Sequence, residues 1–107
     1  MSPKATKEFV SFIKSFFMNK RKKINKIIFF GSYAVGKNLK DSDIDIAIVS
    51  EEFDGTDIFQ RAEILKGLQW SLVEHFMIPF DIVPISLKEW KSKSSLMVKI
   101  IRETIHG

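Results

Sequence analysis

The chain has 107 residues, of which 45% are hydrophobic and 28% charged, and its formal net charge is +4. This length predicts one domain over residues 1–107, and no apolar run approaches the roughly 20 residues that a membrane-spanning helix needs. The chain has no cysteine, which excludes disulfides and thiolate metal sites. Because its first residues also lack the apolar segment of a signal peptide, we expect a cytoplasmic protein. The charge excess is too small to indicate direct nucleic-acid binding.

Hydrophobic spacing predicts the elements of the first half of the chain. A stripe of apolar residues at helical spacing predicts a helix from about Lys4 to Asn19; the stripe consists of Phe9, Phe12, Ile13, Phe16 and Phe17. An apolar run then predicts a strand over Ile24–Phe30. A short turn or helix over Tyr33–Leu39 leads into a second strand, Ile44–Val49.

A loop and a long helix are expected next. The loop covers Glu51–Gly55, and helical spacing continues from Asp57 to Phe76. Thr56 or Asp57 is expected to cap the N-terminus of this helix, because both side chains can accept a hydrogen bond from a free backbone N–H group.

The last part of the chain predicts a third strand and a final helix. The strand covers Ile78–Ile85, and Pro84 predicts that it ends there or lies at a sheet edge. Ser86 is expected to cap a helix over Leu87–Ile105, whose inward residues are predicted to be Trp90, Met97, Ile100 and Ile101. The whole order predicts an α/β or α+β domain, with a small mixed β-sheet flanked by helices.

The most informative motif is the pair Gly31-Ser32, followed after ten residues by Asp43-Ile44-Asp45. Side chains of a strand alternate between its two faces, so Asp43 and Asp45 are expected on one face. Two neighbouring carboxylates resist ionising together, and a divalent cation such as Mg²⁺ removes that conflict. A glycine-led turn beside them offers backbone N–H groups to phosphate oxygens. The motif therefore predicts a site for a nucleoside triphosphate and a metal.

A third acidic residue, Asp81, lies within the apolar run Phe80–Val83. Burying a lone carboxylate there is costly unless a partner compensates its charge. If the third strand lies beside the second, Asp81 can join Asp43 and Asp45 around one or two Mg²⁺ ions. Such a set suits a two-metal transfer of a phosphoryl-type group.

The spacing Gly31-Ser32-x10-Asp43-x-Asp45, with Asp81 downstream, resembles that of the minimal nucleotidyltransferases. These are small prokaryotic members of the DNA polymerase β-like superfamily, and the resemblance covers nearly the full chain. It implies the polymerase β-like fold. It also implies that Gly31 and Ser32 hold the nucleotide phosphates, that Asp43 and Asp45 bind metal, and that Asp81 completes the triad and helps to activate the acceptor. The implied reaction transfers AMP from Mg-ATP to a hydroxyl and releases pyrophosphate.

One position departs from the family pattern. Family members often have the order G-S-x-A-R-G, whereas this chain has Val35 in place of the arginine, followed by Gly36 and Lys37. We assign Lys37 as a candidate phosphate-binding residue that supplies the missing positive charge.

The resemblance also implies a partner. Minimal nucleotidyltransferases are commonly encoded beside a small helical protein of the HEPN class, an RNase toxin, so an antitoxin that adenylylates a tyrosine of this partner is implied. A non-catalytic antitoxin that acts by occlusion is an alternative, as is transfer to a small hydroxylated molecule, for which a homo- or hetero-oligomer could complete the pocket. Asp43, Asp45 and Asp81 could also be solvated strand residues, and Lys37 a solvated lysine.

Overall fold

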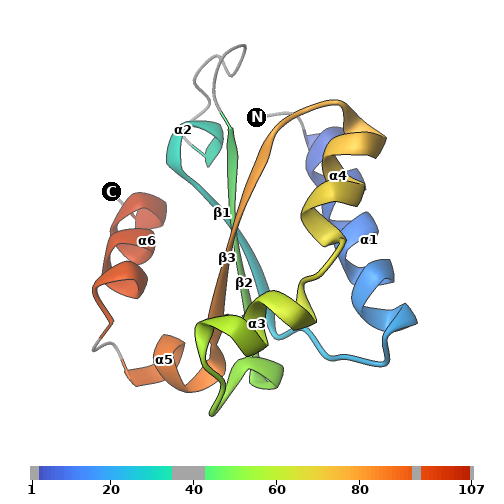
Figure 1. Cartoon of the computed structure of the whole chain (residues 1–107). Helices are drawn as coiled ribbons and strands as arrows, with labels where there is room; N and C mark the ends of the chain where they lie inside the picture. Colours follow the sequence, from blue (N-terminus) through green and yellow to red (C-terminus); the bar gives the residue numbers. More distant parts are fainter. Residues whose placement is uncertain (1–2, 35–42, 93–94, 107) are drawn as a thin grey trace.

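The computed structural model describes residues 3–34, 43–92 and 95–106, and it consists of a three-stranded sheet between two groups of helices (Figure 1). In chain order the elements are α1 (Pro3–Asn19), β1 (Lys26–Phe30), α2 (Gly31–Ala34), β2 (Ile44–Ser50), the 3₁₀ helix η1 (Glu51–Phe53), α3 (Ile58–Ile64), α4 (Leu68–Phe76), β3 (Phe80–Ser86), α5 (Leu87–Ser92) and α6 (Leu96–His106). Helices α1 and α4 lie on one side of the sheet and α6 on the other (Figure 1). The expected α+β fold with a small mixed sheet is confirmed.

Strand β2 is the centre of the sheet. It pairs antiparallel with β1 and parallel with β3, so the strand order is β1-β2-β3. Both of its faces are covered, because Ile44, Ile46 and Ile48 belong to one buried cluster and the alternating residues Ala47 and Val49 belong to another. The predicted alternation of this strand is therefore confirmed.

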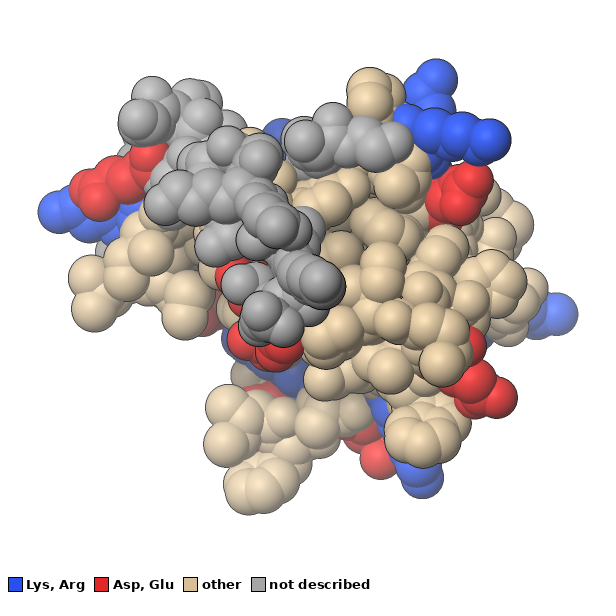
Figure 2. Space-filling model, turned by 90° about the horizontal axis from the view of Figure 1, so that it is seen from above, with Lys and Arg blue, Asp and Glu red and all other residues tan. Residues whose placement is uncertain are grey.

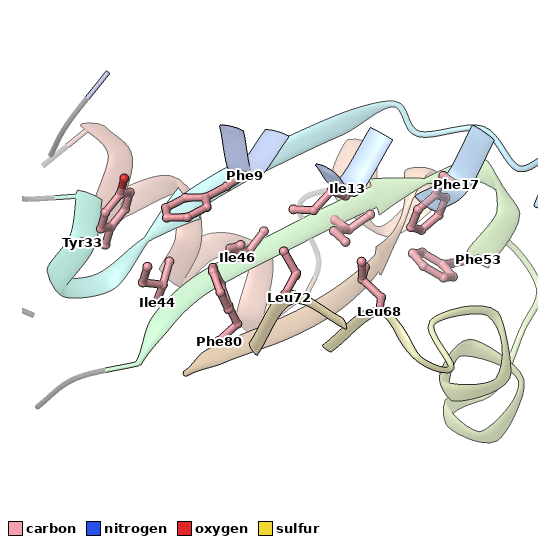
Figure 3. Close-up of a cluster of buried hydrophobic side chains, with 11 residues drawn as sticks. Phe9, Ile13, Phe17, Tyr33, Ile44, Ile46, Phe53, Leu68, Leu72 and Phe80 are labelled. Atoms are coloured by element: carbon pink, nitrogen blue, oxygen red, sulfur yellow. The ribbon is translucent and has the colours of Figure 1, made fainter. Parts of the chain in front are cut away.

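The cluster that contains Ile44, Ile46 and Ile48 is the larger of the two. This larger cluster fills the space between the sheet and the helices α1 and α4 (Figure 3). Three side chains of the predicted stripe of α1 are buried here, namely Phe9, Ile13 and Phe17. Phe9 makes edge-to-face contacts with Phe76 and Phe80, at ring-centroid distances of 4.8 and 5.3 Å. Aromatic pairs favour this arrangement, so the phenylalanines fix how α1 and α4 lie on the sheet.

The smaller cluster lies between the sheet and the helices α5 and α6, and consists of Ala47, Val49, Ile85, Trp90, Val98 and Ile101. Arg102 of α6 lies over the Trp90 ring, with the guanidinium carbon 3.9 Å from the ring centroid, and its Nη2 donates a hydrogen bond to the Trp90 carbonyl. This cation–π contact joins the two C-terminal helices.

The prediction of a single helix over Asp57–Phe76 is wrong, because the structure has two helices there, α3 and α4. The chain turns at Gly67, whose φ of 88° lies in the left-handed region that glycine adopts without a Cβ clash. Lys20 Nζ donates to the carbonyls of Ile64 and Lys66 at the same break and stabilises the end of α3. The predicted cap is confirmed at Asp57, whose side chain accepts from the Gln60 N–H in a reciprocal capping box.

The final predicted helix is also divided, into α5 and α6, with residues 93–94 outside the described ranges. Ser86 does cap α5, since its Oγ accepts a hydrogen bond from the Glu89 N–H. Met97 and Ile100 were expected to face inward, but they are 43% and 45% exposed, and Val98 is buried instead. The prediction is wrong for these two residues because the inward face of α6 runs through Val98 and Ile101, three residues apart on the helix. It is confirmed for Trp90 and Ile101, which are buried.

The boundaries of the other elements differ by small amounts. β1 begins at Lys26, two residues after the predicted start, and β3 continues past Pro84 to Ser86 as an edge strand. The predicted loop Glu51–Gly55 begins with η1. Of the turn or helix predicted over Tyr33–Leu39, the first two residues belong to α2, which begins at Gly31, and residues 35–39 lie outside the described part of the chain. None of the helices in the described part of the chain is long and apolar enough to span a membrane.

Candidate functional site

The predicted acidic residues meet at one edge of the sheet. At this edge β1 ends at Phe30, while β2 and β3 begin at Ile44 and Phe80 (Figure 1). In the parallel register of β2 and β3, Asp45 lies directly opposite Asp81. The expectation that the third strand lies beside the second is therefore confirmed, and two carboxylates from distant parts of the chain are neighbours.

The two aspartates share the sheet face that α6 covers. Ile44 and Ile46, on either side of Asp45, are buried toward α1 and α4, and neighbouring residues of a strand point to opposite faces. Phe80 is buried in the same cluster, which places Asp81 on the opposite face together with Asp45. Asp43 lies just before β2 and is exposed.

The surroundings of Asp45 disfavour its ionised form. Burial raises the pKa of Asp45 above its ordinary value of 3.8, and the negative charges of Asp81 and Asp43 raise it further. Asp45 is thus held where its ionised form is disfavoured, a conflict that a bound cation would relieve. Within the described residues, no three acidic or histidine side chains are already arranged to hold a metal ion. The three carboxylates are close enough to interact, but they do not form a closed set of ligands.

Gly31 lies against the carboxylate of Asp45. A Cβ on Gly31 would overlap Asp45 Oδ2 and lie 3.3 Å from Asp45 Cγ. Its φ of 70° also lies in the left-handed region, which side chains rarely adopt. The backbone conformation therefore favours glycine at position 31, and a larger residue there would displace the Asp45 carboxylate. The glycine and an aspartate of the predicted motif are in contact although 14 positions separate them in the sequence.

The other predicted phosphate-binding residues, Ser32 and Lys37, are not fully described. The backbone of Ser32 lies in α2 beside Gly31, but its side chain is outside the described part of the structure. Val35 and Lys37 lie wholly outside the described residues.

Sequence reasoning missed the role of Tyr33. Its side chain is 6% exposed, and its hydroxyl lies 2.9 Å from the Thr6 hydroxyl of α1. The available signal is an aromatic residue directly after the Gly-Ser pair, in the segment predicted as a short turn or helix.

Comparison with known proteins identifies the domain. Residues 7–103 match the model of the nucleotidyltransferase domain family. The chain belongs to this family. A stretch of 52 residues is 54% identical to "Putative protein adenylyltransferase MJ0604" of Methanocaldococcus jannaschii. That alignment covers 48% of this chain and 49% of the relative, so it spans about half of the relative's length. No solved structure is significantly similar to the chain.

Membership of the nucleotidyltransferase domain family confirms the resemblance that the sequence motif indicated. Enzymes of this class generally use a nucleoside triphosphate and a divalent metal. The residues of this domain fit both groups. Burial and two neighbouring negative charges disfavour the ionised form of Asp45, and the backbone of Gly31 is accessible because it has no side chain. A cation would compensate the charges, and the open backbone would admit a phosphate.

Proposed function

We propose that this nucleotidyltransferase domain transfers AMP from Mg-ATP to a hydroxyl group of a protein. The single observation that carries the proposal is the convergence of Asp45, Asp81 and Gly31 at one sheet edge, where burial and the charges of the other two aspartates raise the pKa of Asp45. Because a raised pKa lowers the stability of the fold at neutral pH, an aspartate at this position is explained better by function than by structure. Perturbed carboxylates at a cleft or edge are a recognised property of functional sites.

Each residue has a proposed role. Asp43, Asp45 and Asp81 hold Mg²⁺, and Gly31 and Ser32 bind the phosphates through their open backbone, with Lys37 adding positive charge. When bound, Mg²⁺ neutralises phosphate charge and lowers the pKa of a coordinated hydroxyl. The acceptor oxygen forms a bond to the α-phosphorus while the bond from this phosphorus to the bridging oxygen breaks, and pyrophosphate leaves. Asp81 orients the acceptor and favours loss of its proton.

The openness of the site supports a macromolecular acceptor. Asp43 and Asp81 are exposed, so an acceptor hydroxyl can reach them at the surface. Figure 2, the view from above, shows acidic side chains at the surface of this end of the molecule. A cavity of about 510 Å³ does exist, but Lys7, Phe12 and His75 line it, between α1 and α4 on the other face of the sheet. A tyrosine on a protein can present its hydroxyl to an exposed edge because the rest of that protein provides the binding energy.

We further propose that the acceptor is a tyrosine of a small helical partner of the HEPN class, which makes the domain an antitoxin. The name of the M. jannaschii relative supports protein adenylylation. The test incubates the chain with its HEPN-type neighbour, ATP and Mg²⁺, and measures the mass of the intact partner. A gain of one AMP, lost when the acceptor tyrosine is replaced by phenylalanine, supports the proposal. An unchanged mass with intact proteins contradicts it.

A non-catalytic antitoxin is the second candidate. The observation in its favour is that the described residues contain no preformed metal-binding set. The variant Asp43→Asn/Asp45→Asn distinguishes the two mechanisms, because it removes two charges without changing the shape of the side chains. If this variant neutralises the partner as well as the wild type does, occlusion rather than transfer is the mechanism. A pyrophosphate-release screen with small hydroxylated compounds tests the remaining alternative.

A further inference from the structure

Helix α2 depends on the rest of the domain for its position. It is a single turn, Gly31–Ala34, and an isolated helical turn is unstable because its nucleation is unfavourable. Tyr33 projects from this turn into the larger cluster, beside Phe9 (Figure 3). Its ring centroid lies 5.4 Å from that of Phe29 and 6.0 Å from that of Phe9. The tyrosine ring therefore packs α2 against both β1 and α1.

The Tyr33 hydroxyl makes a second connection. It lies 2.9 Å from Thr6 Oγ1, so a hydrogen bond joins residues 27 positions apart, with either oxygen as donor. Tyr33 is 6% exposed, and a phenolic hydroxyl among apolar side chains needs such a partner. A ring alone can slide against neighbouring rings, whereas the hydrogen bond fixes how far the tyrosine reaches toward α1.

The position of Tyr33 bears directly on the site. It lies two residues after Gly31 in the same helical turn, so a displacement of the Tyr33 side chain moves the turn that begins at Gly31. Gly31 touches the Asp45 carboxylate so closely that it has no room for a Cβ. A small movement of Tyr33 therefore changes how the phosphate-binding backbone lies relative to the acidic groups.

We propose that Tyr33, anchored by Thr6, is a positioning residue that aligns the Gly31 backbone with the Asp45 carboxylate for nucleotidyl transfer. The inference rests on the proposed function for its kinetic consequence, but the alignment itself is a property of the fold. Through Thr6, the N-terminal turns of α1 then contribute to the reaction, although α1 lies on the opposite side of the sheet from the acidic face.

The test compares Tyr33→Phe, Thr6→Val and the double variant with the wild type. Each single variant removes one hydroxyl and keeps the shape of the side chain. We expect kcat for pyrophosphate release to fall about tenfold in each, with a smaller change in KM for ATP, because misalignment affects the transition state more than binding. The double variant should be no slower than the single variants, because all three lack the same hydrogen bond.

Ser86→Ala is the matched control. It also removes a buried hydroxyl that makes a hydrogen bond, but at the far end of β3. It should lower the melting temperature and leave kcat unchanged. Tyr33→Phe and Thr6→Val variants that behave like this control, with normal kcat, would overturn the positioning role.

Amide hydrogen exchange at Gly31 and Ala34 separates the two proposals, because it needs no turnover. Faster exchange in the Tyr33 and Thr6 variants, with no change in Ser86→Ala, supports the alignment, and unchanged exchange overturns it. A wild-type protein that releases no pyrophosphate with its partner contradicts the proposed function, and the exchange result still decides whether Tyr33 positions the turn.

Discussion

Replacing Asp45 with asparagine should stabilise the folded protein when no divalent cation is present. Asp45 lies opposite Asp81 in the register of two parallel strands, and adjacent strands are about 5 Å apart. Two unit charges at about 5 Å repel by about 0.8 kcal/mol in water and about 3 kcal/mol at an effective dielectric constant of 20. Because Asp81 is exposed, the lower part of this range applies, and we expect a gain of about 1 kcal/mol.

The gain should depend on pH in a defined direction. The pKa of Asp45 is raised in the folded state by burial and by the charges of Asp81 and Asp43. Stability linked to Asp45 is therefore greatest at low pH and is lost as the pH rises through the folded-state pKa. The advantage of Asp45→Asn over the wild type is complete above that pKa. It should vanish below the ordinary value of 3.8, where the carboxyl is protonated in both states.

Thermal unfolding followed by circular dichroism in EDTA measures this effect. At pH 7 the Asp45→Asn variant should melt about 5 °C above the wild type, and at pH 3 the two should melt together. Mg²⁺ should raise the melting temperature of the wild type and not that of the variant. Glu103→Gln, which neutralises an exposed carboxylate of α6, is the control and should change stability by less than about 0.5 kcal/mol. A variant that melts at or below the wild type at pH 7 would refute the electrostatic reasoning.

Three further predictions concern single residues. Gly31→Ala should reduce pyrophosphate release more than about 100-fold, because the new Cβ meets the Asp45 carboxylate; Gly55→Ala, also at a positive φ but with open space around it, should cost only about 1 kcal/mol and keep full activity. Phe53→Ala should lower the urea-extrapolated free energy of unfolding by about 3–5 kcal/mol, since Phe53 is fully buried, and a loss below about 1 kcal/mol would contradict its place in the core. For Glu89, burial raises the pKa, but hydrogen bonds from Ser86 and Arg61 outweigh burial and hold the pKa below its ordinary value. Glu89→Gln should therefore destabilise the protein by about 1 kcal/mol at pH 7, after allowance for solvent screening, and by less as the pH falls through the folded-state pKa, as pH-dependent urea unfolding would test.

Local patterns in the sequence were sufficient to predict helix α1, strand β2 and the protein family. The apolar stripe of α1 predicted a helix over Lys4–Asn19, and the structure has α1 over Pro3–Asn19. The alternation in Ile44–Val49 predicted β2 and its two faces, because a strand has a period of two. The Gly-Ser pair and the acidic spacing were sufficient to indicate the nucleotidyltransferase family, which the family comparison confirms.

Tertiary structure decided the features that depend on residues far apart in the chain. Helical periodicity in the sequence continues through Gly67, yet the helix is interrupted there. Lys20, which follows α1, donates hydrogen bonds to the carbonyls of Ile64 and Lys66 at this interruption. The contact between Gly31 and Asp45, and the raised pKa of Asp45, depend on which strands pair. A periodic pattern reports only whether a residue has an apolar environment. The neighbours that supply this environment, and hence the charges and distances of the site, are fixed only when the strands and helices pack.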